Sequence, residues 1–471
     1  MTDISLRPYQ SAAIDQMRQI MRSGKKRVVA VAPTGAGKTI IASRLIQGAV
    51  AKNHQALFVA PRRELVDQAS AKLDAVGIAH GIIMADHHRV QPWQTVQVAS
   101  VPTLARRLEK TPLQPSLIIL DECHHATAAS YQAILDNWPE AYVIGLTATP
   151  ERSDGRGLGE IFEELVEVAK IRDLIDQGYL VPPRVWAPEK LDLSGLRVSR
   201  GDYDERQLAD LMNQPKLVGN LVSTWQKLGQ GVTTVCFAVS VAHSQTITRA
   251  FTDAGIRAAH LDGETPTPER ERILRDLASG VLQVVANVMV LTEGWDMPRA
   301  ACCIMARPTM STGLFLQMAG RVLRTHPGKA EARILDHAGL VYSHGLPDQN
   351  REWSLEAPRR TRKGEKVLAV TRCESCFAVM LAGTKTCPQC GFERAGVEGR
   401  SDPRHDEQGE MAEVHHVDPE AQKMNKARLL KARFEAQAKA KGYKPGWVTH
   451  RLAAIVGPKI AYAIAPRESA E

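Results

Sequence analysis

The sequence predicts an α/β protein with two parallel-sheet domains in tandem, followed by a small cysteine-rich module and a basic helical tail. Two observations support this prediction. Short apolar runs rich in β-branched residues alternate with helical segments as far as about Tyr342, which is typical of sheets covered by helices. Beyond that point, paired cysteines and then clustered lysines and arginines replace the alternation. The length of 471 residues leaves room for about three domains.

Five strands and three helices are predicted for the first domain. The strands are Val28–Ala32, Ala56–Ala60, Gln97–Ser100, Leu117–Leu120 and Tyr142–Leu146. The helices lie around Ile40–Val50, Glu64–Val76 and Ser130–Leu135. Apolar strands that alternate with helices favour a parallel sheet that is covered on both faces.

The same alternation resumes in the second domain. The predicted strands are Thr233–Val239, Arg257–His260, Gln283–Val288, Ala301–Ala306 and Ala332–Asp336. Between the domains, Pro182–Pro215 is rich in proline, glycine and charge, so it is interpreted as a linker with a small insertion. The predicted boundaries are 1–180 and 216–345 for the domains, 181–215 and 346–370 for linkers, 371–394 for the cysteine module, 395–420 for a charged linker and 421–471 for the tail.

The composition excludes several classes of protein. Hydrophobic residues make up 44% and charged residues 24%, which excludes a mostly disordered or fibrous chain. No apolar stretch reaches the ~18 residues that span a bilayer, and Met1–Gln10 has no signal-peptide core, so a soluble cytoplasmic protein without a membrane partner is expected. The net charge is +8, and residues 351–471 hold 22 basic and 16 acidic side chains. Most of the excess charge therefore lies in the tail, which is consistent with a polyanionic partner.

A glycine-rich turn follows the first predicted strand and leads into the first predicted helix, which lies around Ile40–Val50. A strand, such a turn and a helix together form the usual setting of a phosphate-binding loop. Backbone N–H groups of the turn would contact phosphate oxygens, Lys38 would reach the β- and γ-phosphates of ATP, and the Thr39 hydroxyl would bind Mg²⁺. A chance glycine-rich turn is the alternative. The predicted loop comprises Pro33, Thr34, Gly35, Ala36, Gly37, Lys38 and Thr39, and Ala32 stands where such loops usually begin with glycine.

Two carboxylates end the predicted strand Leu117–Leu120. Asp121 is placed to hold Mg²⁺ through water, and Glu122 is placed to orient and deprotonate the water that attacks the γ-phosphate. A solvated pair at a strand end is the alternative. Cys123 and the two histidines after it look like a metal cluster, but three consecutive residues at a strand–loop junction rarely converge on one ion. No metal is therefore predicted there, and His124 is expected near the γ-phosphate or the next motif.

Four motifs in this order resemble those of the superfamily 2 helicases and translocases. They are Ala32–Thr39, Asp121-Glu-Cys-His124, Leu146-Thr-Ala-Thr-Pro150 and Gln317-Met-Ala-Gly-Arg-Val-Leu-Arg324. The acidic box is a variant of both the DEAD and the DEAH patterns. Leu6-Arg-Pro-Tyr-Gln10 resembles the adenine-reading motif of the repair-associated branch, which includes XPB-like, UvsW-like and RadD-like proteins. The resemblance covers roughly residues 5–340 and implies two RecA-like domains with ATP in the cleft between them.

The resemblance also implies roles for individual residues at that cleft. Gln10 would read the adenine edge and Arg7 would stack on the base, unless both simply begin a surface helix. Gln317, Arg321 and Arg324 would share one face of one helix, from which the two arginines would reach the γ-phosphate; a structural arginine face is the alternative. Near the ATP ribose, the resemblance places Gly294 and Asp296.

Contacts with nucleic acid are implied by the same resemblance. Arg62, Ser100 and Thr103 would donate to backbone phosphates without reading sequence, and Thr292 would face a phosphate of the strand. Loop caps and helix N-caps are the alternative interpretation of the first three. Thr147 and Thr149, in the third of the motifs, would couple hydrolysis to domain closure.

The cysteine module contains two C-x-x-C pairs that are separated by ten residues. Four thiolates suit tetrahedral Zn²⁺ in a closed structural site; a redox pair or an iron–sulfur cluster is the alternative. The ligands would be Cys373, Cys376, Cys387 and Cys390, and the remaining cysteines are interpreted as buried. In the tail, eight lysines and arginines between Ala421 and Pro445, with Phe434 and Tyr443 among them, suit the phosphates and bases of a strand; a solvated basic helix is the alternative.

Taken together, these features imply a nucleic-acid-stimulated ATPase that translocates on, unwinds or remodels DNA in repair, recombination or replication. Its partners would be single-stranded, forked or branched DNA and possible repair or recombination proteins. Three alternatives stay open: an RNA helicase, an ATP-gated adaptor that binds without moving, and a restriction-type motor subunit. The last would need a nuclease partner, because the sequence contains no recognisable nuclease motif.

Overall fold

The structure is a computed structural model that describes residues 5–150, 157–187, 196–199, 202–356, 370–372, 379–381, 386, 392–393, 412–414, 427–428, 430–431, 434–435, 438, 446–456 and 462–463. The chain divides into two compact units. The larger comprises Met1–Val367 with Asp406–Ala412, and the smaller comprises Leu368–His405 with Glu413–Glu471. Each unit has a hydrophobic core of its own.

The first domain of the larger unit is built on a parallel sheet, as the sequence predicts. Its strands are β1 (Arg27–Val31), β2 (Ala56–Ala60), β3 (Gly81–Ile83), β4 (Val96–Ser100), β5 (Leu117–Asp121), β6 (Tyr142–Thr147) and β7 (Glu164–Glu167). They run in the order β3-β4-β2-β5-β6-β1-β7, and every adjacent pair is parallel. The edge strands β3 and β7 were not predicted, because each is short and neither forms an apolar run of strand length. Since all the strands are parallel, the segments that follow them meet at one edge of the sheet.

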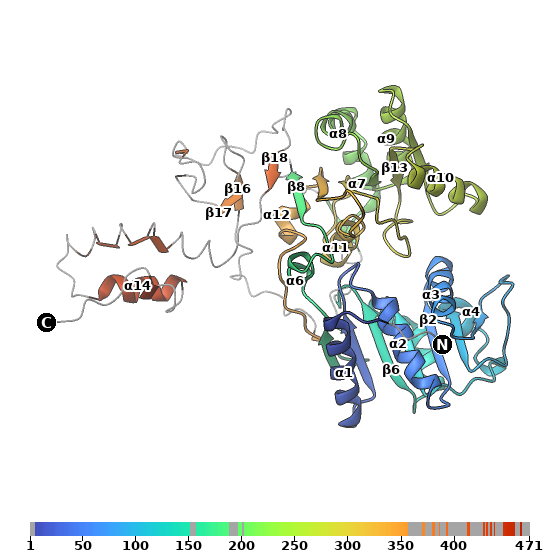
Figure 1. Cartoon of the computed structure of the whole chain (residues 1–471). Helices are drawn as coiled ribbons and strands as arrows, with labels where there is room; N and C mark the ends of the chain where they lie inside the picture. Colours follow the sequence, from blue (N-terminus) through green and yellow to red (C-terminus); the bar gives the residue numbers. More distant parts are fainter. Residues whose placement is uncertain are drawn as a thin grey trace. The chain divides into compact units, whose positions relative to one another are not determined.

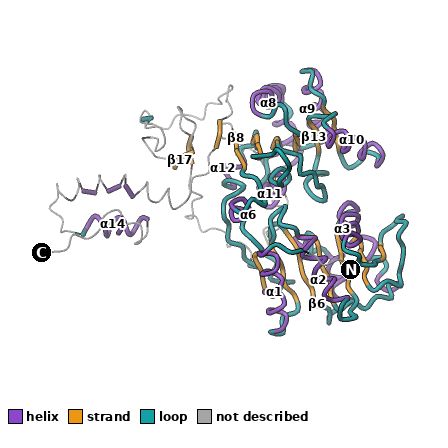
Figure 2. The backbone as a smooth tube through the Cα atoms, viewed as in Figure 1, coloured by secondary structure: helices purple, strands orange, loops and turns teal. Residues whose placement is uncertain are grey.

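Helices separate these strands along the chain (Figures 1 and 2). They are α1 (Pro8–Arg22), α2 (Lys38–Val50), α3 (Arg63–Ala75), α4 (Val101–Ala105), α5 (Ala129–Asn137) and α6 (Ile171–Asp176), with the short 3₁₀ helices η1 (Leu108–Lys110) and η2 (Cys123–His125). Strand β5 is buried at all five positions, as expected for a central strand covered on both faces. Its Ile118 packs in one core cluster with Leu57, Leu135 and Phe162.

Gly145 in β6 leaves no room for a side chain. A Cβ atom there would lie 2.5 Å from Cζ of Phe162 and 2.7 Å from Sγ of Cys123, both of them buried. We expect Gly145→Ala to lower the free energy of unfolding by about 1–3 kcal/mol, because overpacking forces neighbouring side chains out of place. Urea unfolding would measure the change. Gly219→Ala is the control, since it faces open space on a helix and should be neutral or slightly stabilising.

The second domain is also built on a parallel sheet, and one of its strands corrects the predicted linker. Its strands are β8 (Pro183–Ala187), β11 (Thr234–Phe237), β12 (Ala258–Leu261), β13 (Val284–Asn287), β14 (Cys302–Met305) and β15 (Ala332–Asp336). These six strands lie side by side in the order β12-β13-β11-β14-β15-β8, and every adjacent pair is parallel. Strand β8 was assigned to the linker 181–215, because its adjoining prolines suggest a break. Pro183 occupies the first position of the strand, where a missing N–H group is tolerated.

The rest of the second domain consists of helices and one small hairpin. The hairpin strands are β9 (Val198–Ser199) and β10 (Asp202–Tyr203), and the helices are α7 (Glu205–Met212), α8 (Pro215–Leu228), α9 (Val241–Asp253), α10 (Thr267–Ser279), α11 (Thr312–Gly320) and α12 (Leu340–His344). Helices α9 and α10 pack against β13 (Figure 1). Trp186 of β8 and Trp225 of α8 share a core cluster. The segment predicted as a linker therefore contributes to the fold of the second domain.

The smaller unit is described only in part. Its elements are the antiparallel pair β16 (Val370–Arg372) and β17 (Val379–Leu381) and the helix α14 (Trp447–Val456), and the short strand β18 (Ala412–Val414) begins at the last residue of the larger unit. The four cysteines predicted to bind zinc lie outside the described residues, as does most of the segment 395–445. Phe434 is buried and packs edge-on against Trp447 with a centroid distance of 5.8 Å, so it is not free to stack on a base. Among the described residues, no helix is long and apolar enough to cross a bilayer.

Candidate active site

The predicted phosphate-binding loop has the predicted setting. Strand β1 leads into the turn, and α2 begins at Lys38. Gly35 and Gly37 have φ angles of +91° and +84°, which favour glycine over any other residue. The N-terminal turn of α2 leaves backbone N–H groups without helical partners, and such groups bind phosphate oxygens well. The local geometry therefore fits an anion such as the phosphates of ATP.

The start of α1 contacts this loop directly. Nε2 of Gln10 donates to the carbonyl oxygen of Ala36 at 2.9 Å, and the hydroxyl of Tyr9 donates to the same oxygen at 3.0 Å. Oε1 of Gln10 accepts from the backbone N–H of Arg7 at 3.0 Å. The guanidinium of Arg7 lies 4.2 Å from the ring centroid of Tyr179. Tyr9 and Tyr179 were not predicted as site residues; Tyr9 stands inside the quoted motif, whereas no local signal marks Tyr179.

The two carboxylates lie at the end of β5, and the loop lysine reaches one of them. Nζ of Lys38 donates to Oε1 of Glu122 at 3.0 Å. Burial would raise the pKa of Glu122, but the charge of Lys38 and its hydrogen bond hold the pKa below its usual value. Burial and the charge of Glu122 raise the pKa of Asp121 to about 7. Glu122 is therefore a charged carboxylate, and Asp121 occupies a place that favours an added cation.

Glu122 also has an unusual backbone conformation. Its φ and ψ angles are 48° and 49°, the left-handed region that non-glycine residues seldom occupy. Such strain is commonly found at functional sites, where surrounding contacts maintain it. Here the backbone N–H of Glu122 donates to Oδ1 of Asp121 at 3.1 Å. The turn separates the two carboxylates and directs Glu122 toward Lys38.

The predicted arginine helix is wrong in one respect. Helix α11 ends at Gly320, so Gln317 lies on it, whereas Arg321 is its C-cap and Arg324 follows the helix and pairs with Leu180 in a β-bridge. The two arginines nevertheless meet, since both donate to the carbonyl oxygen of Trp295, at 2.7 and 3.3 Å. The sequence spacing suggested a continued helix, but the chain turns here to bring both guanidiniums to one carbonyl.

The guanidiniums of Arg321 and Arg324 concentrate positive charge beside the carbonyl oxygen of Trp295. Burial and, next to it, the charge of Arg324 lower the pKa of Arg321 to about 10. Arg324 forms an ion pair with Asp296 at 2.8 Å, while Nε of the buried Arg321 has no hydrogen-bond partner within the described part of the chain. Cγ of Arg324 would lie 3.4 Å from a Cβ atom on Gly35 of the phosphate-binding loop. The side chain of Arg324, from the second domain, thus packs against the loop of the first, and Arg321 shares the carbonyl oxygen of Trp295 with it.

Gly320 makes the closest approach between α11 and the loop. A Cβ atom at Gly320 would lie 2.5 Å from Cβ of Thr34 and 2.8 Å from its hydroxyl oxygen. We expect Gly320→Ala to push the domains apart and to lower kcat by about 10²-fold, since misplacement by 1 Å has effects of that size. Nucleotide binding to the first domain should persist. Steady-state ATP hydrolysis and nucleotide binding would be measured beside Gly219→Ala, and an unchanged kcat would refute the contact.

The four residues predicted to contact nucleic acid are occupied within the chain. Arg62 donates to the carbonyl oxygen of Met289 and forms an ion pair with Oε2 of Glu293, both at 3.2 Å. The hydroxyl of Ser100 donates to that of Thr103 at 2.9 Å. Thr292 is buried and donates to the carbonyl oxygen of Met289 at 2.7 Å. Arg62 therefore joins the two domains, and Thr292 is turned toward its own backbone.

Glu293 and Gly294 of the second domain contact the first domain. The carbonyl oxygen of Gly294 accepts from the side chain of Gln68 on α3, and Arg270 of α10 forms an ion pair with Glu64 at 2.6 Å. Glu293 lies next to Gly294, is only 7% exposed and was not predicted as a site residue. It stands between Thr292 and Gly294, two residues that were predicted as site residues, so its position, but not its contacts, was available from the sequence.

Comparisons with known proteins agree with this arrangement. The family described as "Type III restriction enzyme, res subunit" matches residues 3–152, and the "Helicase conserved C-terminal domain" matches residues 214–326. A "51.5 kDa protein" of a Lactococcus phage is 31% identical over 363 residues, which cover 77% of each chain. The chain belongs to the superfamily 2 helicases. This helicase is therefore a nucleic-acid-dependent ATPase, and ATP and Mg²⁺ are its expected ligands.

Two further relatives and one solved structure are similar to this helicase. The "putative ATP-dependent helicase IRC3" of Saccharomyces cerevisiae is 34% identical over 71% of this chain and 51% of its own length, so the helicase spans about half of that relative. The "DNA 3'-5' translocase XPB2" of Sulfurisphaera tokodaii is 25% identical over 68% and 79%. A fragment of a putative HsdR subunit of a type I restriction enzyme from Vibrio vulnificus shares the fold, with a TM-score of 0.59, 23% identity, and coverage of 73% and 66%.

Proposed function

We propose that this helicase is an ATP-dependent DNA translocase or unwinding enzyme whose hydrolysis site lies between its two domains. The observation that best supports the proposal is the pair of guanidiniums of Arg321 and Arg324, with the Arg324 side chain packed against the phosphate-binding loop. A buried guanidinium with an unpartnered Nε, next to a second guanidinium, favours an anion in this cleft. The γ-phosphate of ATP on the loop is such an anion.

Each member of the site has a role that its contacts support. Lys38 would leave Glu122 for the phosphates of ATP, which frees that carboxylate to orient the attacking water and accept its proton. Gln10 and Tyr9 hold the loop at Ala36, and the adenine is proposed to bind beside Gln10 and Arg7. Gly294 contacts Gln68 of the first domain, and the ribose of ATP is proposed to bind beside Gly294 and Asp296. Gln317 is buried on α11 and is proposed to line the same cleft.

The oxygen ligands expected for Mg²⁺ are present. Thr39 supplies a hydroxyl and Asp121 a carboxylate, and hard oxygen donors of this kind suit the ion. The raised pKa of Asp121 fits the same assignment, because an added cation would restore its charged form. When bound, Mg²⁺ neutralises charge on the phosphates. The protein groups orient the water, hold its proton and stabilise charge from the opposite domain.

Movement on DNA would follow from opening and closing of the cleft. Arg62, Ser100 and Thr103 follow the carboxyl ends of β2 and β4, at the same edge of the sheet as the hydrolysis site. Their donors suit phosphate oxygens, and Arg62 would exchange its bond to Glu293 for one to the strand. Thr292 would need to turn from Met289 to take part. DNA is favoured over RNA by the name of the Sulfurisphaera relative, and a role in repair or recombination rests on the resemblance to the same branch.

The test is steady-state ATP hydrolysis without polymer and with single-stranded DNA, forked DNA or RNA. We expect strong stimulation by DNA, little by RNA, and loss of the activity in Glu122→Gln. Stimulation mainly by RNA would transfer the proposal to RNA remodelling. A hydrolysis rate that no polymer changes would refute the proposed motor and favour an ATP-gated adaptor. Strand-displacement assays on forked DNA would then distinguish unwinding from translocation alone.

The cysteine module is proposed to bind one structural Zn²⁺. Cys373 and Cys376 lie in the sequence between the paired strands β16 and β17, and Cys387 and Cys390 lie between the bridged residues Thr386 and Glu393. Paired strands on either side of each C-x-x-C pair are consistent with a zinc ribbon.

Removing one thiolate should therefore remove the metal. We expect Cys390→Ser to lower the zinc content of the purified chain by about one equivalent and to unfold the small unit, since such sites stabilise their domains directly. Elemental analysis would measure the zinc. Ser375→Ala, which keeps all four thiols, is the control, and equal zinc contents in both variants would exclude the site.

A further inference from the structure

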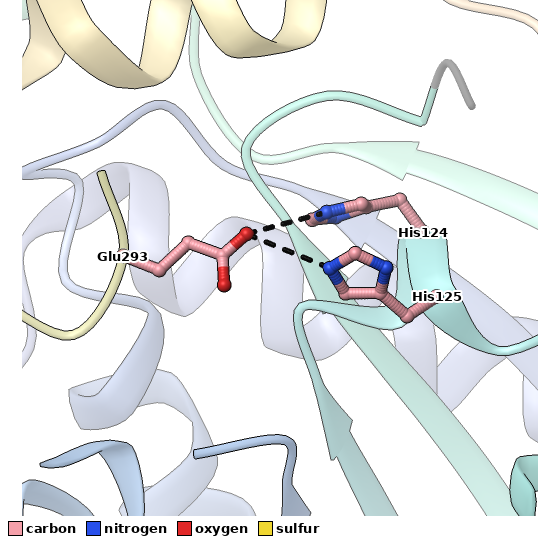
Figure 3. Close-up of side chains that lie close together, drawn as sticks. All are labelled: His124, His125 and Glu293. Carbon is pink, nitrogen blue, oxygen red and sulfur yellow. Dashed lines mark ion pairs between the residues drawn. The ribbon is translucent and has the colours of Figure 1, made fainter. Parts of the chain in front are cut away.

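Three metal-binding side chains from different domains converge at the domain boundary (Figure 3). His124 and His125 lie on η2, directly after β5, and Glu293 lies in the segment after β13. Oε1 of Glu293 is 3.8 Å from Nε2 of His124 and 3.5 Å from Nε2 of His125. The ligand atoms of all three residues lie within 4.8 Å of one another.

Hydrogen bonds around His124 determine which ring nitrogen carries a proton. The hydroxyl of Thr147 lies 2.6 Å from the carbonyl oxygen of Thr149, so its proton is committed to that bond and its oxygen can only accept elsewhere. Nδ1 of His124 lies 3.2 Å from the same hydroxyl oxygen and must therefore be the donor. In the neutral ring, Nε2 then presents a lone pair toward Glu293 and favours a cation between them.

Contacts behind the ligands support the same conclusion. Nδ1 of His124 also lies 3.5 Å from Oε2 of Glu122, and a histidine that binds metal commonly donates its other N–H to an oxygen acceptor of this kind. Arg62 holds the second oxygen of Glu293, which leaves Oε1 directed at the two rings.

We propose that His124, His125 and Glu293 bind a transition-metal dication such as Zn²⁺ across the domain boundary. Two imidazole nitrogens and one carboxylate oxygen suit this ion, which lies about 2.0–2.2 Å from each such ligand and keeps a fourth position open. The site differs from that proposed for Mg²⁺, which uses oxygen ligands of one domain. Cys123 is not a ligand, because it is buried in the core beside Gly145.

Because the ligands come from both domains, the ion would bind most tightly when the cleft is closed. Anything else that favours closure, such as a non-hydrolysable ATP analogue, would raise the affinity for the ion, and the ion would raise the affinity for the analogue by the same factor. Zn²⁺ would then hold the domains together and slow the reopening that each cycle requires. The inference rests on the proposed closure, but the binding step itself needs neither hydrolysis nor DNA.

The experiment is titration of the full-length protein with Co²⁺, followed by its visible absorption, and with Zn²⁺, followed by calorimetry. His125→Ala is the main variant, because the side chain is 47% exposed and its removal should not disturb folding. Glu293→Gln removes the ligand from the other domain. His54→Ala, an exposed histidine of the first domain, is the matched control.

We expect the wild type and His54→Ala to bind one equivalent of the metal ion at this site. His125→Ala and Glu293→Gln should bind that equivalent at least about 100-fold more weakly. The ATP analogue should tighten binding in the wild type. Equal affinities in all four proteins would overturn the site and leave a direct contact between protonated imidazoles and Glu293. Since the readout does not use ATP turnover, this failure would be distinct from failure of the proposed motor.

Discussion

Replacing Glu122 with glutamine is expected to lower the DNA-stimulated rate of ATP hydrolysis by about 10²–10⁴-fold, the usual contribution of a positioned general base. The amide keeps the size of the side chain but cannot accept the proton of the attacking water. ATP binding should be at least as tight as in the wild type, because Lys38 loses the carboxylate that it now contacts at 3.0 Å. Steady-state kinetics and equilibrium binding of a fluorescent ATP analogue would measure the two effects.

The control for this substitution is Glu109→Gln, which changes an exposed carboxylate of the same domain. It should leave both quantities unchanged. If Glu122→Gln retained more than a tenth of the wild-type rate, another group would have to activate the water. If it also lost ATP binding, the substitution would have disturbed the strained turn after β5 rather than the chemistry alone.

Replacing Arg324 with alanine is expected to lower kcat by about 10³-fold or more, as removal of an arginine finger does. Arg324 suits this test better than Arg321, because its side chain is 18% exposed whereas Arg321 is almost fully buried. Arg324→Lys should recover little activity, since a lysine keeps the charge but loses the planar fork of donors. Single-turnover hydrolysis with saturating ATP would separate this effect from changes in nucleotide binding.

The matched control is Arg275→Ala, which removes an arginine of α10 that is 69% exposed. Its rate should equal that of the wild type. A normal kcat in Arg324→Ala would contradict the proposed role and favour a purely structural pair with Asp296. Recovery of full activity in Arg324→Lys would indicate that charge alone, rather than the geometry of the guanidinium, is required.

Much of the larger unit was predictable because its signals are local. Strand β2 matches the predicted range of residues, since an uninterrupted apolar run has few other ways to be buried. The phosphate-binding loop was predictable for a similar reason: its two glycines adopt backbone angles that few other residues tolerate. The edge strand β7 escaped prediction, because it is short, half-polar and defined by its pairing with β1.

Strand β8 and the arginines show where local signals mislead. Pro182 and Pro183 suggest a linker, yet the residues after them pair with β15 and bury Trp186 in the core of the second domain. The spacing of Gln317, Arg321 and Arg324 suggests one helix, yet α11 ends at Gly320 and both guanidiniums turn to the carbonyl oxygen of Trp295. In each case a contact distant in sequence outweighs the local preference.

By itself, the sequence determined the parallel α/β class, the phosphate-binding loop, the paired carboxylates and the superfamily, because each depends on residues close together in the chain. The tertiary structure decided which of them meet. It brought Arg324 beside Gly35 and Arg321 beside Arg324, bound Arg62 to the second domain, and added Glu293 to two histidines that had been excluded as a metal site. The reason is physical: a site between two domains needs groups that are far apart in the chain, and only their packing determines the distances between them.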